Sequence, residues 1–324
     1  MPTRSIFRGC LLGGALGDAL GAPIEFLNLR AIREAHGPRG LTDLVEPEIT
    51  DDTQMTLFTA EALVRARAPG SPGLAVEGWH AYLRWLSTQR ERVPAGTGAT
   101  LDGWLLATPA LHARRAPGNT CLSALRSGRM GTPAAPLNDS KGCGTVMRVA
   151  PIGLALAPRE AFEAGCALSA ITHGHPTGWL AGGALAAIVS RVARGEALRE
   201  AARAVAGELE GVPGAQETVA ALRGAFGLAA RGEPTPEALE TLGGGWVAEE
   251  ALAIGLAAAL VARDFAHGVL LAVNHSGDSD STGAIAGNLL GAALGEAALP
   301  AAWVVKVELG AEVLRAADEL HAGC

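Results

Sequence analysis

Aromatic and strand-forming side chains are scarce in this sequence of 324 residues, which has one tyrosine and 4% aromatic residues. Runs of β-branched and aromatic residues build strands, so their scarcity argues against a β-sandwich, a barrel or a large sheet. The chain instead contains 43 glycines and is visibly rich in alanine. Because small side chains allow helices to pack closely, we expect an all-α fold.

An excess of positive charge is also missing. The 26 lysines and arginines are outnumbered by 33 aspartates and glutamates, which gives a formal net charge of −7. An acidic chain without a basic block argues against a nucleic-acid backbone as the main partner. It does not exclude a small anionic ligand, because backbone N–H groups or a metal can bind phosphate without net positive charge.

Paired cysteines are absent as well, since the chain has an odd number of widely spaced cysteines and no CxxC motif. These are Cys10, Cys121, Cys143, Cys166 and Cys324. The pattern predicts a reduced, cytoplasmic protein and not a disulfide scaffold. It also argues against a zinc site built on these cysteines.

Polar residues interrupt the apolar stretches. The stretch near the N-terminus contains Asp18 and has no clean cleavage site, so we expect a helix of the folded domain and not a signal peptide. The longest uncharged stretch, between Glu163 and Arg191, holds two histidines and a proline in its middle. The sequence therefore predicts no membrane span.

Apolar residues recur at helical spacing through most of the chain. We expect helices over residues 6–20, 54–67, 79–86, 120–128, 159–171, 178–194, 248–263, 264–274, 284–294 and 304–321, and an amphipathic helical region over 197–230. A loop over 37–49 and a connection rich in glycine, proline and arginine over 93–141 separate some of them. No repeat and no linker interrupts the pattern, so we expect a single domain over residues 1–324.

Two acidic segments are candidate metal ligands. In Thr50-Asp51-Asp52-Thr53, adjacent carboxylates flanked by hydroxyls offer the hard oxygen ligands that Mg²⁺, Mn²⁺ or Ca²⁺ prefers, although ordinary helix capping explains the same residues. In the segment 277–283, Asp278 and Asp280 can point toward one ion from a tight turn. That segment lacks the distal glutamate of an EF-hand loop.

The second acidic segment lies between apolar runs. Burial of its carboxylates requires a metal or other partners, which argues against a capped surface turn. The small residues that follow, 283–287, predict a helix that packs closely against another backbone.

Three further features are weaker on their own. The glycine-rich segment 138–145 can present N–H groups to a phosphate but is not a Walker A loop, and on its own a plain loop is the favoured interpretation. The pair His173 and His175 could ligate a soft metal, but one hydrogen-bonding and one structural histidine is the more common arrangement. Glu25 is a lone acid after an apolar stretch, for which a surface position is the default interpretation.

Taken together, these segments resemble the ADP-ribosylglycohydrolase family. The matching segments occur in the family's order and cover nearly the whole chain, and the widely separated TDDT and GDSDS pair is specific. They read GDALGAPIE, TDDTQ, GNTC, SKGCGTVMRVAPIGL, THGHP, GGGWVAEEAL and HSGDSDSTGAIAGNLLGA.

The resemblance implies a compact, single-domain, all-α orthogonal helical bundle with a cleft that binds two Mg²⁺ or Mn²⁺ ions. It assigns the metal ligands to Thr50, Asp51, Asp52, Asp278, Asp280 and Ser281. It assigns the acidic residue of the active-site loop to Glu25 and a ligand-contacting histidine to His173. The diphosphate-binding loop falls on Ser140, Lys141, Gly142, Cys143 and Gly144, where Cys143 replaces the asparagine of several relatives.

The implied reaction is removal of ADP-ribose from a modified protein or peptide, with ADP-ribose as product and no nucleic acid or membrane as partner. Such cleavage passes through an oxocarbenium-like state, and either Glu25 or Asp52 is expected to transfer the proton. The Asp278-Ser279-Asp280-Ser281 segment looks like that of arginine-specific members, and an acidic rim would favour an arginine leaving group. The alternatives are hydrolysis of O-linked ADP-ribose, on serine or as an acetyl ester, and a non-catalytic relative that binds ADP-ribosyl groups or blocks a toxin.

Overall fold

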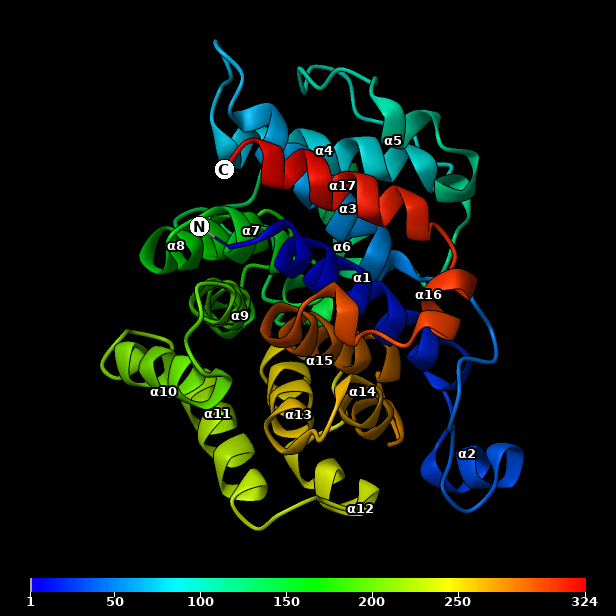
Figure 1. Ribbon diagram of the computed structural model, residues 1–324. Coiled ribbons are helices and arrows are strands. Elements are labelled where there is room, and N and C mark those ends of the chain that lie inside the picture. Colours follow the sequence, from blue (N-terminus) through cyan, green and yellow to red (C-terminus); the bar gives the residue numbers. More distant parts are fainter. Residues whose placement is uncertain (1) are drawn as a thin grey trace.

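A computed structural model describes residues 2–324, and this part of the chain forms 17 α-helices and no sheet (Figure 1). The first eight are α1 (Arg4–Gly21), α2 (Leu29–His36), α3 (Asp51–Ala66), α4 (Leu74–Thr88), α5 (Trp104–Ala107), α6 (Asn119–Arg126), α7 (Ala150–Ala155) and α8 (Pro158–Ala170). The others are α9 (Pro176–Ala193), α10 (Leu198–Leu209), α11 (Gln216–Ala229), α12 (Pro236–Leu239), α13 (Ala248–Val261), α14 (Phe265–Val273), α15 (Ser279–Leu294), α16 (Ala301–Lys306) and α17 (Gly310–Ala322). The expected all-α fold is therefore confirmed.

Helices α1 and α15 form the centre of the fold and run antiparallel in direct backbone contact. Glycines at every fourth position of α1 face glycines at every fourth position of α15, and a Cβ added to any of them would meet the opposite backbone at 2.6 Å or less. The facing pairs are Gly9 with Gly291, Gly13 with Gly287, and Gly17 with Gly283. The close approach expected from residues 283–287 is confirmed.

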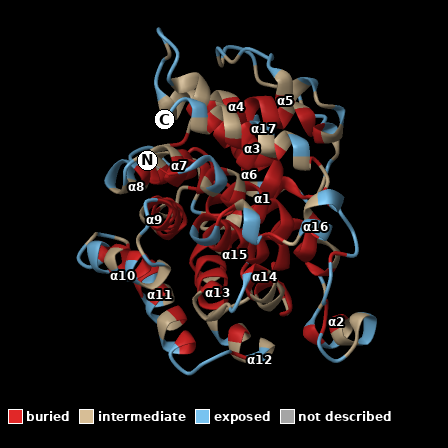
Figure 2. Ribbon diagram, in the orientation of Figure 1, coloured by how far each residue is buried: buried red, intermediate tan, exposed pale blue. Residues whose placement is uncertain are grey.

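The remaining helices cover this central pair. Helices α13 and α14 pack on α15, whereas α3 and α17 pack on α1. Helix α9 packs between α7 and α8 on one side and α13 and α15 on the other (Figure 1). Figure 2 shows that burial is most continuous along the central helices, while the outer faces of α2, α10 and α12 are exposed.

Most expected helices are present, and four differ clearly in their bounds. The helix expected over 79–86 is α4, which begins five residues earlier, at Leu74. Helix α15 begins at Ser279, five residues earlier than expected, because Asp278 caps it by accepting a hydrogen bond from the backbone N–H of Ser281. The region 197–230 is two helices, since Gly211 and Gly214 adopt φ of +84° on either side of Pro213. The last expected helix, 304–321, is divided into α16 and α17 at Leu309, which has a positive φ of +57°.

The five cysteines are unpaired thiols, as their spacing predicts. No single helix of residues 2–324 is long and apolar enough to cross a membrane. The segments Arg4–Ile24 and Leu29–His36 are together long and apolar enough to span a membrane, but the chain bends by 94° between them. Helix α1 is also buried in the core from Phe7 onward, except for Arg8.

The contact between α1 and α15 generates a stability prediction. A Cβ at position 287 would lie 2.0 Å from the carbonyl oxygen of Gly13. Because that oxygen belongs to the backbone of α1, it cannot move away as the end of a flexible side chain could. We expect Gly287→Ala to lower the free energy of unfolding by about 1–3 kcal/mol or more, measured by urea denaturation. The control is Gly207→Ala on α10, which meets nothing within 4 Å and should stabilise the protein by about 0.5–1 kcal/mol. Equal effects of the two substitutions would contradict this account of the contact.

Candidate active site

The first acidic segment begins α3. Thr50 is the N-cap residue, and its hydroxyl accepts a hydrogen bond from the backbone N–H of Asp52 at 3.2 Å. Asp51 and Asp52 occupy the first turn, where the positive end of the helix dipole favours carboxylates. An oxygen of Asp51 also accepts a hydrogen bond from the N–H of Gly118 at 3.2 Å. Helix capping, one of the two interpretations of this segment, thus accounts for Thr50 but leaves oxygens of both aspartates free.

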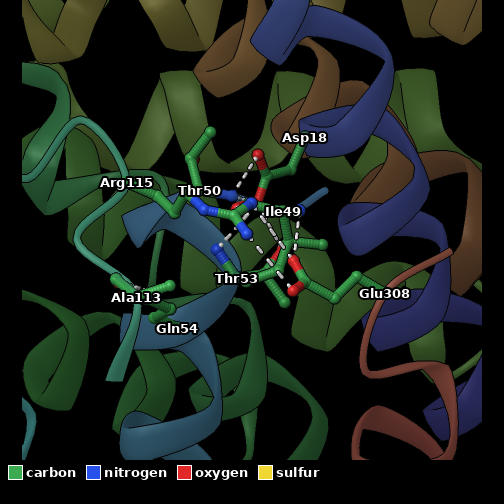
Figure 3. A network of polar contacts seen from close by, with 8 residues as sticks. All are labelled: Asp18, Ile49, Thr50, Thr53, Gln54, Ala113, Arg115 and Glu308. Carbon is green, nitrogen blue, oxygen red and sulfur yellow. Dashed lines mark hydrogen bonds and ion pairs between the residues drawn. The ribbon is translucent and has the colours of Figure 1, made fainter. Parts of the chain in front are cut away.

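Asp18 of α1 fixes the position of this helix start, a role that the sequence analysis missed. Its carboxylate accepts hydrogen bonds from the backbone N–H groups of Thr50 and Thr53 at 3.0 Å and from the Thr53 hydroxyl at 2.5 Å (Figure 3). Burial and the charge of Asp280 raise the pKa of Asp18 to about 7, although the threonine hydrogen bonds lower it. The signal available in the sequence was a lone acid inside an apolar, glycine-rich helix, because a buried acid needs partners.

A second set of contacts holds α3 from the other side. The carbonyl of Arg115 accepts a hydrogen bond from the Asp51 N–H at 3.1 Å. The Arg115 guanidinium contacts Glu308 at 3.3–3.4 Å (Figure 3). Glu308 in turn accepts a hydrogen bond from the N–H of Ile49 at 3.1 Å. The start of α3 is therefore fixed both by α1 and by the segment before α17.

The second acidic segment begins α15, beside the end of α1. One oxygen of Asp280 accepts a hydrogen bond from the Ser281 N–H at 2.9 Å. The short 3₁₀ helix after α1, Ala22–Ile24, brings Glu25 to the same place, so that ligand atoms of Glu25, Asp278 and Asp280 lie within 4.8 Å of one another. Residues separated by more than 250 positions in the sequence thus form one cluster.

The charges of Asp51 and Asp52 also act on this group, so the five acids together form the carboxylate cluster, which is buried without a positive partner. Glu25 is 8% exposed, and Asp51, Asp52, Asp278 and Asp280 are all buried. None of these five carboxylates forms an ion pair with an arginine, lysine or histidine in residues 2–324. Burial holds the pKa of Asp51, Asp52 and Asp278 well above the ordinary range, and their neighbours' negative charges raise it further. Burial and the charge of Asp280 raise the pKa of Glu25 to about 9.

The donor set fits hard divalent cations. One oxygen of Asp52 is buried and has no hydrogen-bond partner, which is costly unless a ligand completes the site. Carboxylate and hydroxyl oxygens are the ligands that Mg²⁺, Mn²⁺ and Ca²⁺ prefer. The residues expected to hold metal, including Thr50 and Ser281, lie at the starts of α3 and α15, on the two acidic segments that form this site.

The glycine-rich loop lies against the same cluster. Cys143 donates a hydrogen bond from Sγ to an Asp278 oxygen at 2.8 Å, which joins the loop to the start of α15. His173 lies beneath the loop, because a Cβ on Gly142 or Gly144 would meet its ring at 3.0–3.2 Å. Burial and the nearby Arg148 lower the pKa of His173 to about 3, so the ring is neutral.

Lys141 extends from this loop toward the acids of α11 and α13. Its ammonium donates to Glu217 at 2.7 Å and also contacts Glu249. The hydroxyl of Ser140, the residue before Lys141, contacts the hydroxyl of Thr120 on α6 at 3.1 Å. The lysine charge is therefore already compensated, and the loop meets the cluster through Cys143.

A hollow of about 310 Å³ opens beside the cluster. It is lined by Glu25 and Thr50, by the exposed acids Glu46 and Glu48, and by Arg115. Phe26, next to Glu25, stacks on Trp246 with ring centroids 5.7 Å apart, although Phe26 is 73% and Trp246 44% exposed. This aromatic pair, which the sequence analysis did not anticipate, joins the Glu25 segment to the segment that follows Gly243–Gly245.

The metal-free cluster predicts an unusual dependence of stability on pH. A carboxyl whose pKa is raised on folding binds more protons in the folded state, so stability falls as pH rises between its unfolded and folded pKa values. For Glu25 this window runs from 4.5 to about 9. We expect the free energy of unfolding of EDTA-treated protein to fall across this window, by up to about 1.4 kcal/mol per pH unit for each such carboxyl, and the Tm to fall with it.

Addition of Mg²⁺ or Mn²⁺ should raise the Tm and flatten this dependence, because bound cations favour the ionised carboxylates. Asp51→Asn, which removes one charge from the cluster, is the matched variant and should show a shallower pH dependence without metal. A Tm that responds to neither pH nor metal would contradict the cluster's role as a cation site.

Comparison with known proteins identifies the family to which the chain belongs. A sequence model of the ADP-ribosylglycohydrolase family matches residues 1–324. The chain is 28% identical to the ADP-ribosyl-[dinitrogen reductase] glycohydrolase of Rhodospirillum rubrum, over 97% of this chain and 95% of that protein. It is 26% identical to the ADP-ribosylarginine hydrolase Tri1 of Pseudomonas putida, over 97% of this chain and 77% of that protein.

A solved structure described as an ADP-ribosylglycohydrolase-related protein complex is similar in fold. The TM-score is 0.71 at 27% sequence identity, and the match covers 98% of both chains. The family match extends from the first to the last residue of the sequence. The chain therefore belongs to the ADP-ribosylglycohydrolase family.

Proposed function

We propose that this chain hydrolyses the bond between ADP-ribose and a modified protein side chain, and that its preferred linkage is the N-glycosidic bond to arginine. The family and the names of two relatives support an ADP-ribosyl hydrolase activity. The observation that carries the proposal is the cluster of buried carboxylates without positive partners, which faces a hollow through Glu25. Such a cluster is suited to cations, and the hollow is suited to a substrate that those cations orient.

Two Mg²⁺ or Mn²⁺ ions are the cofactors that we propose. The residues that would hold them are Thr50, Asp51, Asp52, Asp278, Asp280 and Ser281. When bound, such ions orient hydroxyl groups of a substrate and lower the pKa of a water molecule. The four aspartates balance the charge of two divalent cations, which accounts for their burial without lysine or arginine partners.

Glu25 is the group that we assign to proton transfer. In the hydrolysis, a water oxygen forms a bond to the anomeric carbon of the ribose while the bond from that carbon to the guanidine nitrogen breaks. One water proton must be accepted by a base, and the leaving nitrogen must gain a proton. Glu25 lines the hollow, whereas an oxygen of Asp52 is enclosed within the cluster, so Glu25 is the better placed of the two candidates.

The loop from Ser140 to Gly144 is the segment that we assign to the diphosphate. Its contact with Asp278 through Cys143 puts it beside the cations that would hold the ribose. Lys141 is paired with Glu217 and Glu249, so the loop would bind phosphate through backbone N–H groups and not through the lysine charge. A neutral His173 beneath the loop supports its conformation.

The acidic lining of the hollow supports the preference for arginine. Glu46 and Glu48 are exposed, form no ion pair in the described chain, and lie beside Glu25 where a departing guanidine would leave. Arg115 also lines the hollow, but Glu308 engages its guanidinium. A serine leaving group would gain nothing from these charges, because it carries none.

Replacement of Glu25 tests the proton-transfer role. We expect Glu25→Gln to lower kcat on an ADP-ribosyl-arginine peptide by about 10²–10⁴-fold, because the amide cannot transfer a proton in either direction. The affinity for Mn²⁺, measured by calorimetry, should change much less. Glu34→Gln on the exposed face of α2 is the control and should retain full turnover. Turnover near that of the unmodified protein would leave Glu25 with a positioning role only.

Substrate preference tests the linkage. On matched peptides, kcat/KM for ADP-ribosyl-arginine should exceed that for ADP-ribosyl-serine by at least about tenfold, or roughly 1.4 kcal/mol. Because exposed ion pairs contribute about 0.2–1 kcal/mol, Glu46→Gln and Glu48→Gln should each raise KM for the arginine peptide by up to about fivefold and leave that for serine unchanged.

The control for this comparison is Glu210→Gln, an exposed acid at the end of α10 that pairs with Arg223 and does not line the hollow. Equal kcat/KM on the two peptides, or a preference for serine, would overturn the arginine assignment. No release of ADP-ribose from either peptide with Mg²⁺ or Mn²⁺ present would overturn the hydrolase assignment itself.

A further inference from the structure

A buried cation follows the loop over 140–144 in the sequence. Arg148, in the segment between this loop and α7, is fully buried. Within the described chain its guanidinium donates to no carboxylate, and the acceptors are the sulfurs of Met55 and Cys121, the carbonyl of Leu168 and the hydroxyl of Thr172. Because a buried charge without an acidic partner is costly, these contacts indicate a role for Arg148 beyond packing.

The contacts of Thr172 determine the direction of its hydrogen bonds. A guanidinium has donors and no acceptor, so the Thr172 oxygen accepts from Arg148 at 2.7 Å. The same buried oxygen lies 2.8 Å from Nδ1 of His173. The Cys121 thiol is also near, but burial raises its pKa, and a neutral sulfur is a weak acceptor. The hydroxyl proton is therefore best satisfied by Nδ1, which must then be the unprotonated nitrogen of the ring.

The single proton of the neutral ring consequently lies on Nε2. Burial and the charge of Arg148 lower the pKa of His173 to about 3, so the ring has one N–H at neutral pH. Nε2 faces the loop, because it would lie 3.2 Å from a Cβ on Gly142 and 3.4 Å from one on Gly144. It forms no hydrogen bond with any residue that the structure describes. The ring thus presents a free N–H donor to the loop.

Backbone contacts fix the distance between this histidine and the loop. The side chain of Asn138 donates to the carbonyl of Thr172 at 2.8 Å. Its oxygen accepts from the N–H of Ser140 at 3.0 Å and from the N–H of Gly174 at 3.1 Å. The loop and the segment that carries the histidine are therefore bound to each other, and the threonine hydroxyl determines which ring nitrogen carries the proton.

We infer that Thr172, whose hydroxyl Arg148 orients, is a positioning residue that holds His173 as the Nε2–H tautomer, so that the ring donates a hydrogen bond to the diphosphate of ADP-ribose. The inference rests on the proposed assignment of the loop to the diphosphate, whereas the tautomer itself depends on no activity. With its proton on Nδ1, the ring would instead present a lone pair to a phosphate oxygen, which would repel it. A neutral N–H beside the backbone N–H groups of the loop favours an anion without a further buried charge.

Nitrogen NMR of the full chain, labelled with isotopic nitrogen in histidine, tests the tautomer directly. Long-range correlations between protons and nitrogens distinguish the two neutral forms, and the signals lost in His173→Gln assign the ring. We expect the Nε2–H form at neutral pH, and a shift of the Nε2 signal when ADP-ribose and Mg²⁺ are added. An Nδ1–H form, or an Nε2 signal that bound ADP-ribose leaves unchanged, would overturn the inference.

Three variants test the threonine hydroxyl. Thr172→Val keeps the shape of the side chain but removes the hydroxyl, and the Kd of ADP-ribose should rise about tenfold, or about 1.4 kcal/mol. On an ADP-ribosyl-arginine peptide, KM should rise with little change in kcat, because the diphosphate contact is the same before and during the reaction. Thr172→Ser, which restores the hydroxyl, should bind ADP-ribose like the unmodified protein. The control is Thr218→Val, where a buried hydroxyl without a hydrogen-bond partner is removed.

Equal affinities of Thr172→Val and Thr172→Ser for ADP-ribose would contradict the role of the hydroxyl. If Thr172→Val does not fold, the spectrum of the unmodified protein still decides the tautomer. A chain that hydrolyses ADP-ribosyl-arginine peptide but shows the Nδ1–H form overturns only the role of Thr172. The Nε2–H form, shifted by ADP-ribose, in a chain that releases no ADP-ribose from any peptide overturns only the proposed activity.

Discussion

The antiparallel contact between α1 and α15 is the constraint on which the rest of this structure depends. Because glycines face each other along both helices, the backbones approach more closely than any side chain allows. The end of α1 consequently lies beside the start of α15, where a Cβ on Gly21 would meet the backbone of Ser279 and Asp280 at 2.3 Å. Glu25, four residues after Gly21, therefore lies beside the acidic start of α15.

The same arrangement creates an electrostatic cost. Five carboxylates are buried close enough for their charges to act on one another, and backbone N–H groups, hydroxyls, one thiol and helix dipoles oppose their repulsion. Asp18 adds a further buried acid, but its oxygens are satisfied by Thr50 and Thr53, so it positions α3 and is not a free ligand. Divalent cations would remove the remaining repulsion. The repulsion between the carboxylates, which destabilises the metal-free fold, would therefore favour the binding of metal.

The sequence predicted the helical fold and the glycine contact because small residues at helical spacing leave few other ways to pack. Its acidic segments also lie together in the fold, as their residue types suggested. The break between α10 and α11 was missed, since Ala-rich periodicity on both sides outweighed the turn at Gly211-Val212-Pro213-Gly214. The role of Asp18 and the stacking of Phe26 on Trp246 were missed because both depend on contacts between distant segments. Spacing along the chain carries no information about such contacts.

The central claim is that the carboxylate cluster is a binuclear cation site, and Mn²⁺ binding tests it most directly. Calorimetry on the EDTA-treated chain, together with electron paramagnetic resonance of the bound ions, counts the ions and reports whether they interact. The account predicts two coupled Mn²⁺ ions per chain, and loss of that coupled pair in Asp280→Asn, which removes a charge and a ligand oxygen. A chain that binds no Mn²⁺, or an Asp280→Asn variant that binds two ions as tightly as the unmodified protein, would contradict it.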